Sequence, residues 1–186
     1  ERVCGGLNVR GVPTSQATAD LAVEVGVPLV TLEQEPVLDI TVDGADEVDP
    51  QLDLIKGYGA AMVREKVVAS ASASLIILVG PEKLVPVLGT RGIVPVEVVP
   101  FALAVCRRKL RDLGLNPAPR MREHQIMVTD NGNHILDCRV GPIADPAALE
   151  QSILTLPGVV GSGLFIGMAT RVIVDEGDTV RLLERR

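Results

Sequence analysis

The first part of the chain alternates short apolar runs with patterns of helical spacing. The runs predict strands at residues 7–10, 28–31, 37–42 and 75–79, and the helical spacing predicts helices at 14–25 and 60–72. The first helix can be capped by Thr14 or Ser15. One face of it gathers the apolar residues Ala17, Leu21, Ala22 and Val25. Because strands that alternate with helices stack as βα units, this part is predicted to be an α/β domain with a doubly wound, mostly parallel, Rossmann-like sheet.

The order of the predicted strands and helices changes after residue 92. The pattern predicts a strand at 93–99, a helix at 101–113 ended by Gly114, a strand at 118–122, a hairpin of 126–129 with 134–139, a helix at 146–156 and a strand at 159–166. This β-α-β-β-α-β order is that of a ferredoxin-like unit. Strands at 171–174 and 179–183 would return to the first sheet. We therefore expect residues 1–92 and 169–186 to form the α/β catalytic domain and residues 93–168 an inserted ferredoxin-like α+β small domain.

Composition narrows the class of function. The chain has 186 residues, a formal net charge of -6, one Tyr, two Phe and no Trp. A nucleic-acid partner is therefore not expected, because it would need basic patches and aromatic stacking surfaces. No apolar stretch approaches the length that spans a membrane, so no membrane partner is expected either. The three cysteines are an odd number without a Cys-x-x-Cys pair, which indicates reduced thiols and a cytoplasmic location.

Metal sites are weakly supported by the sequence. His124 and His134 have no Cys or His neighbours at zinc-ligand spacing, and the pattern of a calcium loop is absent. Two carboxylates close together, Asp43 and Asp46, leave open a magnesium site for phosphoryl transfer.

The segment Asp43-Gly44-Ala45-Asp46 follows an apolar strand. In an open α/β sheet, ligands bind in the crevice beyond the carboxyl ends of the strands. The segment could therefore direct two carboxylates into one crevice. Taken alone, it could equally be a turn whose acids are solvated.

A second polar segment, Lys56-Gly57-Tyr58-Gly59, precedes the helix predicted at 60–72. Amides at the start of a helix lack internal partners and favour anions. The dinucleotide pattern G-x-G-x-x-G fails, because position 62 is Met. Glu65, further along this helix, can face the crevice while its sequence neighbours, about 100° away on either side, point elsewhere. The alternative is a solvated residue in a charged run, and Tyr58 could be ordinary packing.

Taken together, these segments resemble the ribose-5-phosphate isomerase A family. The likeness covers nearly the whole chain, and its motifs occur in the family's order. They are Gly11-Val12-Pro13-Thr14-Ser15, Asp43-Gly44-Ala45-Asp46-Glu47-Val48-Asp49, Leu54-Ile55-Lys56-Gly57, Arg64-Glu65-Lys66, Pro95-Val96-Glu97-Val98-Val99-Pro100, Val128-Thr129-Asp130-Asn131-Gly132-Asn133 and Pro157-Gly158-Val159-Val160.

The resemblance implies interconversion of ribose 5-phosphate and ribulose 5-phosphate, a step of the non-oxidative pentose phosphate pathway, through an enediolate and without metal or cofactor. Glu65 would be the general base, with Asp43, Asp46 and Lys56 as further catalytic residues. The sugar phosphate would contact Asp43, Gly44, Ala45, Asp46, Lys56, Gly57, Tyr58, Gly59 and Lys83. The resemblance also implies a homodimer or a homotetramer.

The chain departs from the family pattern at two places. The family usually has another glycine at the position of Tyr58. Its phosphate-holding loop, rich in Gly, Thr and Ser, has no counterpart, because the chain begins beyond it. We therefore expect either a fragment or a protein without this amino-terminal part, whose phosphate affinity would then lack the support of that loop.

Two other classes of function remain open at this stage. One is a sugar-phosphate-sensing domain like the ligand domains of some bacterial repressors, although no helix-turn-helix is visible ahead of it. The other is the magnesium phosphotransferase suggested by the paired aspartates.

Overall fold

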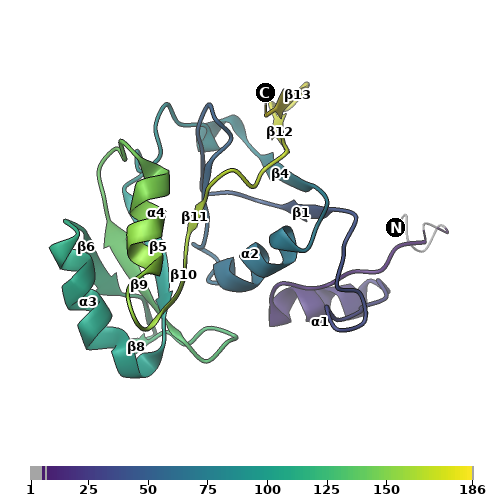
Figure 1. The fold of residues 1–186 in the computed structure, drawn as a ribbon. Coiled ribbons are helices and arrows are strands. Elements are labelled where there is room, and N and C mark those ends of the chain that lie inside the picture. Colours follow the sequence, from purple (N-terminus) through teal and green to yellow (C-terminus); the bar gives the residue numbers. More distant parts are fainter. Residues whose placement is uncertain (1–5, 7, 186) are drawn as a thin grey trace.

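The computed structural model describes residue 6 and residues 8–185, and it shows two units side by side with a helix between them (Figure 1). The helices are α1 (Gln16–Glu24), α2 (Met62–Ser70), α3 (Leu103–Asp112) and α4 (Pro146–Leu154), with 3₁₀ turns η1 (Pro81–Lys83) and η2 (Pro100–Ala102). The strands are β1 (Thr41–Asp43), β2 (Glu47–Val48), β3 (Leu54–Ile55), β4 (Leu75–Val79), β5 (Ile93–Val98), β6 (Asn116–Pro119), β7 (Met121–Arg122), β8 (Gln125–Ile126), β9 (His134–Arg139), β10 (Val159–Ser162), β11 (Leu164–Phe165), β12 (Arg171–Asp175) and β13 (Val180–Glu184).

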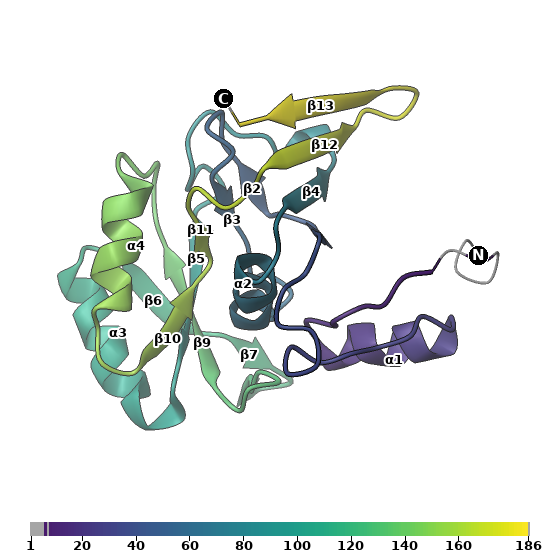
Figure 2. The same ribbon diagram turned by 45° about the vertical axis from the view of Figure 1, so that its right-hand side comes forward.

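The first unit is built on a largely parallel sheet with strand order β1-β4-β12-β13. β1 and β12 each pair in parallel with β4, and β13 joins β12 as an antiparallel edge. Helix α2 lies against β1, and the Thr41 hydroxyl contacts the Ser72 hydroxyl at 2.6 Å. The α/β class and the return of the C-terminal strands to this sheet are confirmed (Figure 2).

The strands predicted at 7–10 and 28–31 do not form as such. Leu7 lies outside the described residues, residues 8–10 have no regular structure, and Gly11 makes only a single parallel bridge to Leu29. Residues 8–10 are exposed, so their apolar pattern buries nothing against a sheet.

The first helix forms where the pattern predicts it, but its apolar face is not buried. The Ser15 hydroxyl caps α1 by accepting from the Thr18 amide at 3.1 Å. However, α1 has no buried residue, and Leu21 is 56% exposed. Within the part of the chain that the structure describes, this face therefore contributes little apolar burial.

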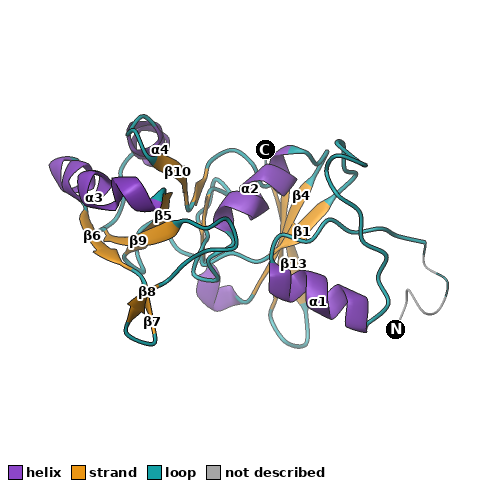
Figure 3. Cartoon of the chain, turned by 90° about the horizontal axis from the view of Figure 1, so that it is seen from below, coloured by secondary structure: helices purple, strands orange, loops and turns teal. Residues whose placement is uncertain are grey.

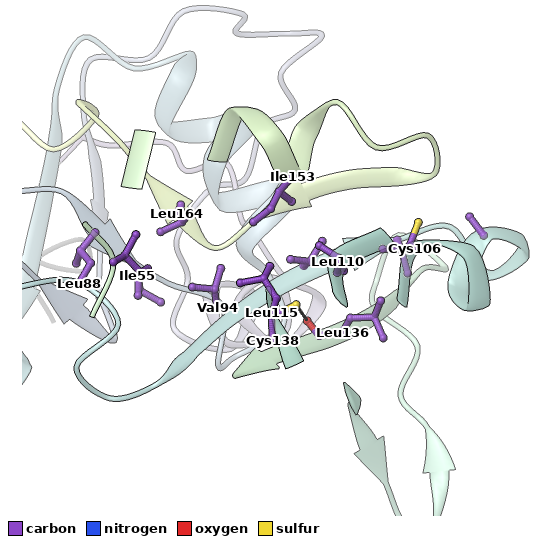
Figure 4. Packing of buried hydrophobic residues seen from close by; sticks show 14 of the residues in the cluster. Ile55, Leu88, Val94, Cys106, Leu110, Leu115, Leu136, Cys138, Ile153 and Leu164 are labelled. Carbon is purple, nitrogen blue, oxygen red and sulfur yellow. Dashed lines mark hydrogen bonds between the residues drawn. The ribbon is translucent and has the colours of Figure 1, made fainter. Parts of the chain in front are cut away.

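The second unit has the predicted ferredoxin-like order. Its antiparallel sheet runs β10-β5-β9-β6, and α3 and α4 pack on one face of it. Side chains that alternate along β5, Val94, Val96 and Val98, meet Leu110 and Ile153 from the two helices in one hydrophobic cluster, part of which is drawn in Figure 4. Burial raises the pKa of two free thiols there, that of Cys138 to about 12, whereas Cys4 lies outside the described residues.

The hairpin predicted between 126–129 and 134–139 is wrong in its pairing. β9 pairs with β5 and β6, β8 pairs with β7, and only Val128 bridges to His134. The reason is that the backbone of Arg120 occupies this edge of β9, since its amide donates to the Ile135 carbonyl at 2.8 Å. The strand predicted at 118–122 is accordingly divided at Arg120.

A small sheet of order β11-β3-β2 connects the two units. The strand predicted at 159–166 breaks at Gly163 into β10, which belongs to the second unit, and β11, which pairs with β3. Viewed from below, α2 lies between the second unit and the main sheet (Figure 3). α2 thus contacts both β1 of the main sheet and β10 of the second unit, and β3 pairs with β11, which follows β10 in the chain.

The hydrophobic clusters cross the predicted domain limits. Ile55 and Leu88 belong to the cluster of the second unit, and Ile135 of β9 belongs to that of the main sheet. The division at 92/93 and 168/169 stays a prediction. Among the described residues, no helix has the length and apolarity needed to cross a bilayer.

Candidate active site

A lysine ammonium lies at the centre of the predicted site. Lys56 follows β3, whose two residues are fully buried, so its side chain begins in the interior and is only 4% exposed. Its Nζ lies 2.9 Å from Asp43 Oδ2 and 3.1 Å from Glu65 Oε2, and it donates to the Gly44 carbonyl at 2.5 Å. One positive charge is therefore shared by two carboxylates.

The two aspartates of residues 43–46, the acid turn, have different partners. Asp43 ends β1, contacts Lys56 and accepts the Gly44 amide on Oδ1 at 2.8 Å. Asp46 instead accepts the Tyr58 amide on Oδ2 at 3.0 Å. Asp43 thereby joins the acid turn to Lys56, and Asp46 joins it to residues 57–59, the glycine loop.

Glu65 lies in the first turn of α2, and its sequence neighbours are held elsewhere. Arg64 donates to the Asn131 side chain at 2.8 Å and to the Asp130 carbonyl at 2.7 Å, while Lys66 donates to Glu150 at 2.5 Å. These contacts to the second unit leave the Glu65 side chain, 14% exposed, directed at Lys56.

The environment of Glu65 favours its protonated form. Burial raises the pKa of this carboxyl above its ordinary value, Lys56 lowers it in part, and the charges of Asp43 and Asp46 raise it further. A carboxylate in such surroundings accepts a proton more readily than a solvated glutamate.

The glycine loop adopts a conformation that depends on its sequence. Gly57 has φ +114°, and a Cβ added there would lie 2.5 Å from the sulfur of Met62. A larger residue is therefore excluded at this position. Within the described part of the chain, the amides of Gly57 and Gly59 donate to no protein group. Tyr58, 40% exposed, has its pKa raised by burial first and then by Asp46 and Glu47.

Lys83 is not brought into this cluster. It ends η1, which follows β4, and its ammonium makes no ion pair or hydrogen bond with the described residues. An open groove of about 590 Å³ runs along β1 and touches the cluster at Asp43. Nowhere in the described ranges do three or more metal-ligating side chains gather.

Two residues at the site carried no signal in the sequence. The ring of Phe165 lies 5.5 Å from the Lys56 ammonium, and the Arg120 guanidinium donates to the carbonyls of Gly57 and Tyr58. Both lie far from the loop in sequence, Arg120 by 63 residues from Gly57, and no local pattern connects them.

Known proteins resemble the chain over almost all of its length. Residues 10–179 match the family model of ribose 5-phosphate isomerase A (phosphoriboisomerase A). The ribose-5-phosphate isomerase A of Roseiflexus sp. (strain RS-1) is 53% identical over 92% of this chain and 74% of its own length. That of Gloeobacter violaceus is 53% identical over 95% of this chain and 78% of its own length.

Solved structures agree with the sequence matches. Ribose 5-phosphate isomerase A from Methanocaldococcus jannaschii superposes with a TM-score of 0.92 at 38% identity, over 98% of this chain and 81% of that one. A D-ribose-5-phosphate isomerase in complex with phospho-erythronic acid gives a TM-score of 0.94 at 39% identity, over 99% of this chain and 82% of that one. The chain belongs to the ribose 5-phosphate isomerase A family, whose members interconvert ribose 5-phosphate and ribulose 5-phosphate in the pentose phosphate pathway.

Proposed function

We propose that Glu65 is the base of this isomerisation and that Asp43, Asp46 and Lys56 complete the catalytic group. The observation behind the proposal is the buried ammonium of Lys56 within 3.1 Å of carboxylates from β1 and α2. Glu65 removes the proton from C2 of the open-chain aldose, and the electron pair moves through C1 onto the carbonyl oxygen. The enediolate then accepts the proton at C1, and the hydroxyl proton moves from O2 to O1.

The proton transfer leaves the total charge of the site unchanged. When Glu65 accepts the proton, its negative charge disappears and an equal charge develops on the substrate oxygens. The ammonium, held by Asp43 and the Gly44 carbonyl, stays in place to stabilise that charge. The amides of Gly57 and Gly59, which donate to no group among the described residues, supply further donors. Asp43 and Asp46 exchange the hydroxyl protons.

The proposed substrate contacts extend along both polar segments. They are Asp43, Gly44, Ala45, Asp46, Lys56, Gly57, Tyr58, Gly59 and, for the sugar phosphate, Lys83. The ligand of one solved relative supports a substrate of this kind, since phospho-erythronic acid joins a phosphate to a carboxylate that resembles the paired oxygens of an enediolate.

Replacement of Glu65 by Gln tests the assignment. The amide is nearly isosteric but cannot accept the proton, so we expect kcat to fall by about 10² to 10⁴-fold. A coupled assay of ribulose 5-phosphate formation measures it. Glu24→Gln, at an exposed position of α1, is the matched control. Equal rates in wild type and Glu65→Gln would refute the role of Glu65.

We propose that turnover needs no metal or cofactor. Lys56 already supplies a positive charge to Asp43 and Glu65, where a magnesium phosphotransferase would place its ion. Isomerase activity should therefore persist after dialysis against EDTA. Loss of activity that added Mg²⁺ restores would contradict this.

The family resemblance also supports an assembly and a location. We propose a cytoplasmic homodimer or homotetramer that binds sugar phosphates and not nucleic acid. Light scattering on the purified chain measures the assembly, and a monomer at assay concentration would contradict it.

A further inference from the structure

A guanidinium from the second unit holds the glycine loop of the first. Arg120 donates to both carboxylate oxygens of Asp137, from Nε at 3.0 Å and from Nη2 at 2.5 Å. Its Nη1 donates to the Gly57 carbonyl at 2.7 Å and to the Tyr58 carbonyl at 3.1 Å. The side chain is only 14% exposed, and a two-pronged pair with a carboxylate fixes the orientation of the fork.

The backbone of Arg120 is fixed as well. Its amide donates to the Ile135 carbonyl at 2.8 Å, and its carbonyl accepts the Met127 amide at 2.9 Å. The residue is thus part of the β6 edge of the second unit's sheet, and its side chain bridges to a loop 63 residues earlier in the sequence. A displacement of this edge would move the loop with it.

Because peptide groups are planar, the contacts of Arg120 with the two carbonyls also fix the direction of the amides that follow them. In a trans peptide the C=O and the following N–H point in opposite directions. Because the Gly57 carbonyl faces Arg120, the Tyr58 amide faces away from it, and there it meets Asp46 at 3.0 Å. Because the Tyr58 carbonyl also faces Arg120, the Gly59 amide is likewise directed away from it, and it donates to no group in the described part of the chain.

We propose that Arg120, oriented by Asp137, is a positioning residue for the isomerisation. It holds two consecutive carbonyls so that the Tyr58 amide fixes Asp46 and the Gly59 amide stays available to the substrate oxygen. The inference rests on the proposed active site. Such donors act mainly on the charge that develops in the transition state, so their misplacement lowers kcat more than it raises KM.

The test uses the whole chain with Arg120→Ala and, as matched control, Arg122→Ala at an exposed position two residues on. We expect Arg120→Ala to lower kcat by about 10²-fold with little change in KM, and added guanidinium ion to restore part of it. Arg122→Ala should keep wild-type kinetics and show no response to guanidinium. An unchanged kcat in Arg120→Ala would overturn the proposal, as would a loss that guanidinium does not relieve.

A second variant covers the case in which Arg120→Ala fails to fold. Asp137→Asn keeps the guanidinium but removes the carboxylate that orients it, and it should lower kcat by about tenfold at unchanged KM. Wild-type kcat in Asp137→Asn would then overturn the proposal. Glu65→Gln, assayed in parallel, tests the proposed base separately from the proposed positioning role of Arg120. If Glu65→Gln is inactive and the variants of Arg120 and Asp137 are fully active, the proposed base stands and only the positioning role fails.

Discussion

Lys56 is the residue on which the charge balance of the site depends. Its ammonium is almost fully buried, which is costly unless opposite charges surround it. Asp43 and Glu65 supply that compensation, and Asp46 adds a further negative charge nearby. Burial raises the pKa of Glu65, Lys56 lowers it in part, and the charges of Asp43 and Asp46 raise it further.

The pH dependence of kcat/KM should report this balance. Protonated Glu65 cannot act as the base, so activity falls as pH drops through its pKa, which burial raises above the ordinary glutamate value. The charge of Asp43 raises that pKa further, so Asp43→Asn should move the acid limb to lower pH, whatever its effect on the maximum. Asp112→Asn, at an exposed position of α3, should leave the limb in place. A limb that moves to higher pH in Asp43→Asn would contradict this account.

At the residue scale, the sequence alone indicated most of the side chains of the candidate site but not which groups they contact. The strand-end rule and the helical spacing pointed to Asp43, Lys56 and Glu65, because both depend on local order in the chain. The attachment of Asp46 to a loop amide and of Arg120 to two loop carbonyls depends on where distant segments meet. No local sequence pattern predicts those contacts.

At the scale of elements, α2 is oriented by charged residues on either side of Glu65. Arg64 binds the turn that follows Val128, and Lys66 binds Glu150 of α4 and the Leu164 carbonyl. The same turn is also held by Glu97 of β5, whose Oε1 accepts from Thr129, Asn131 and Asn133. The second unit therefore sets the rotation of the helix that presents Glu65.

Breaking the Lys66 pair should destabilise the fold. Lys66→Met leaves the Glu150 carboxylate without a cation, with only the Ser162 hydroxyl still donating to it at 3.4 Å. Because the side chains of Lys66 and Glu150 are only 23% and 18% exposed, we expect a loss of about 2 kcal/mol in the free energy of unfolding. The double variant Lys66→Met/Glu150→Leu should recover part of it, since no unpaired charge remains. Urea unfolding measures both.

The pair between Arg171 and Glu184 provides the comparison, because its side chains are more than half exposed. Arg171→Met should therefore change the free energy of unfolding much less than Lys66→Met. Equal losses in the two variants would contradict the importance given to burial.

The helices and the longer strands were predictable, whereas the short strands and part of the strand pairing were not. Hydrophobic periodicity located β4, β5, β12 and the four helices, because each presents a regular face. β3 and β11 are two residues long, too short for any period, yet their pairing joins the two units. The hairpin predicted between 126–129 and 134–139 is also wrong, because β6 and Arg120, earlier in the same unit, pair with the edge of β9 that residues 126–129 could have used.

For the whole molecule, the crossing of the two hydrophobic clusters predicts cooperative unfolding. Ile55 packs with the second unit and Ile135 with the first, so neither unit can unfold without exposing a buried side chain of the other unit. Urea unfolding followed by circular dichroism and by hydrogen exchange in β4 and β5 should give one coincident transition. Two separate transitions would show that the units of the predicted division unfold independently.

The position of Tyr58 has a practical consequence for spectroscopy. It is the chain's only tyrosine, and there is no tryptophan, so all ultraviolet fluorescence excited near the tyrosine band originates in the glycine loop. Its amide contacts Asp46, and the residue is 40% exposed. The protein therefore contains an intrinsic, single-site optical probe with which sugar-phosphate titrations can be followed without any attached dye.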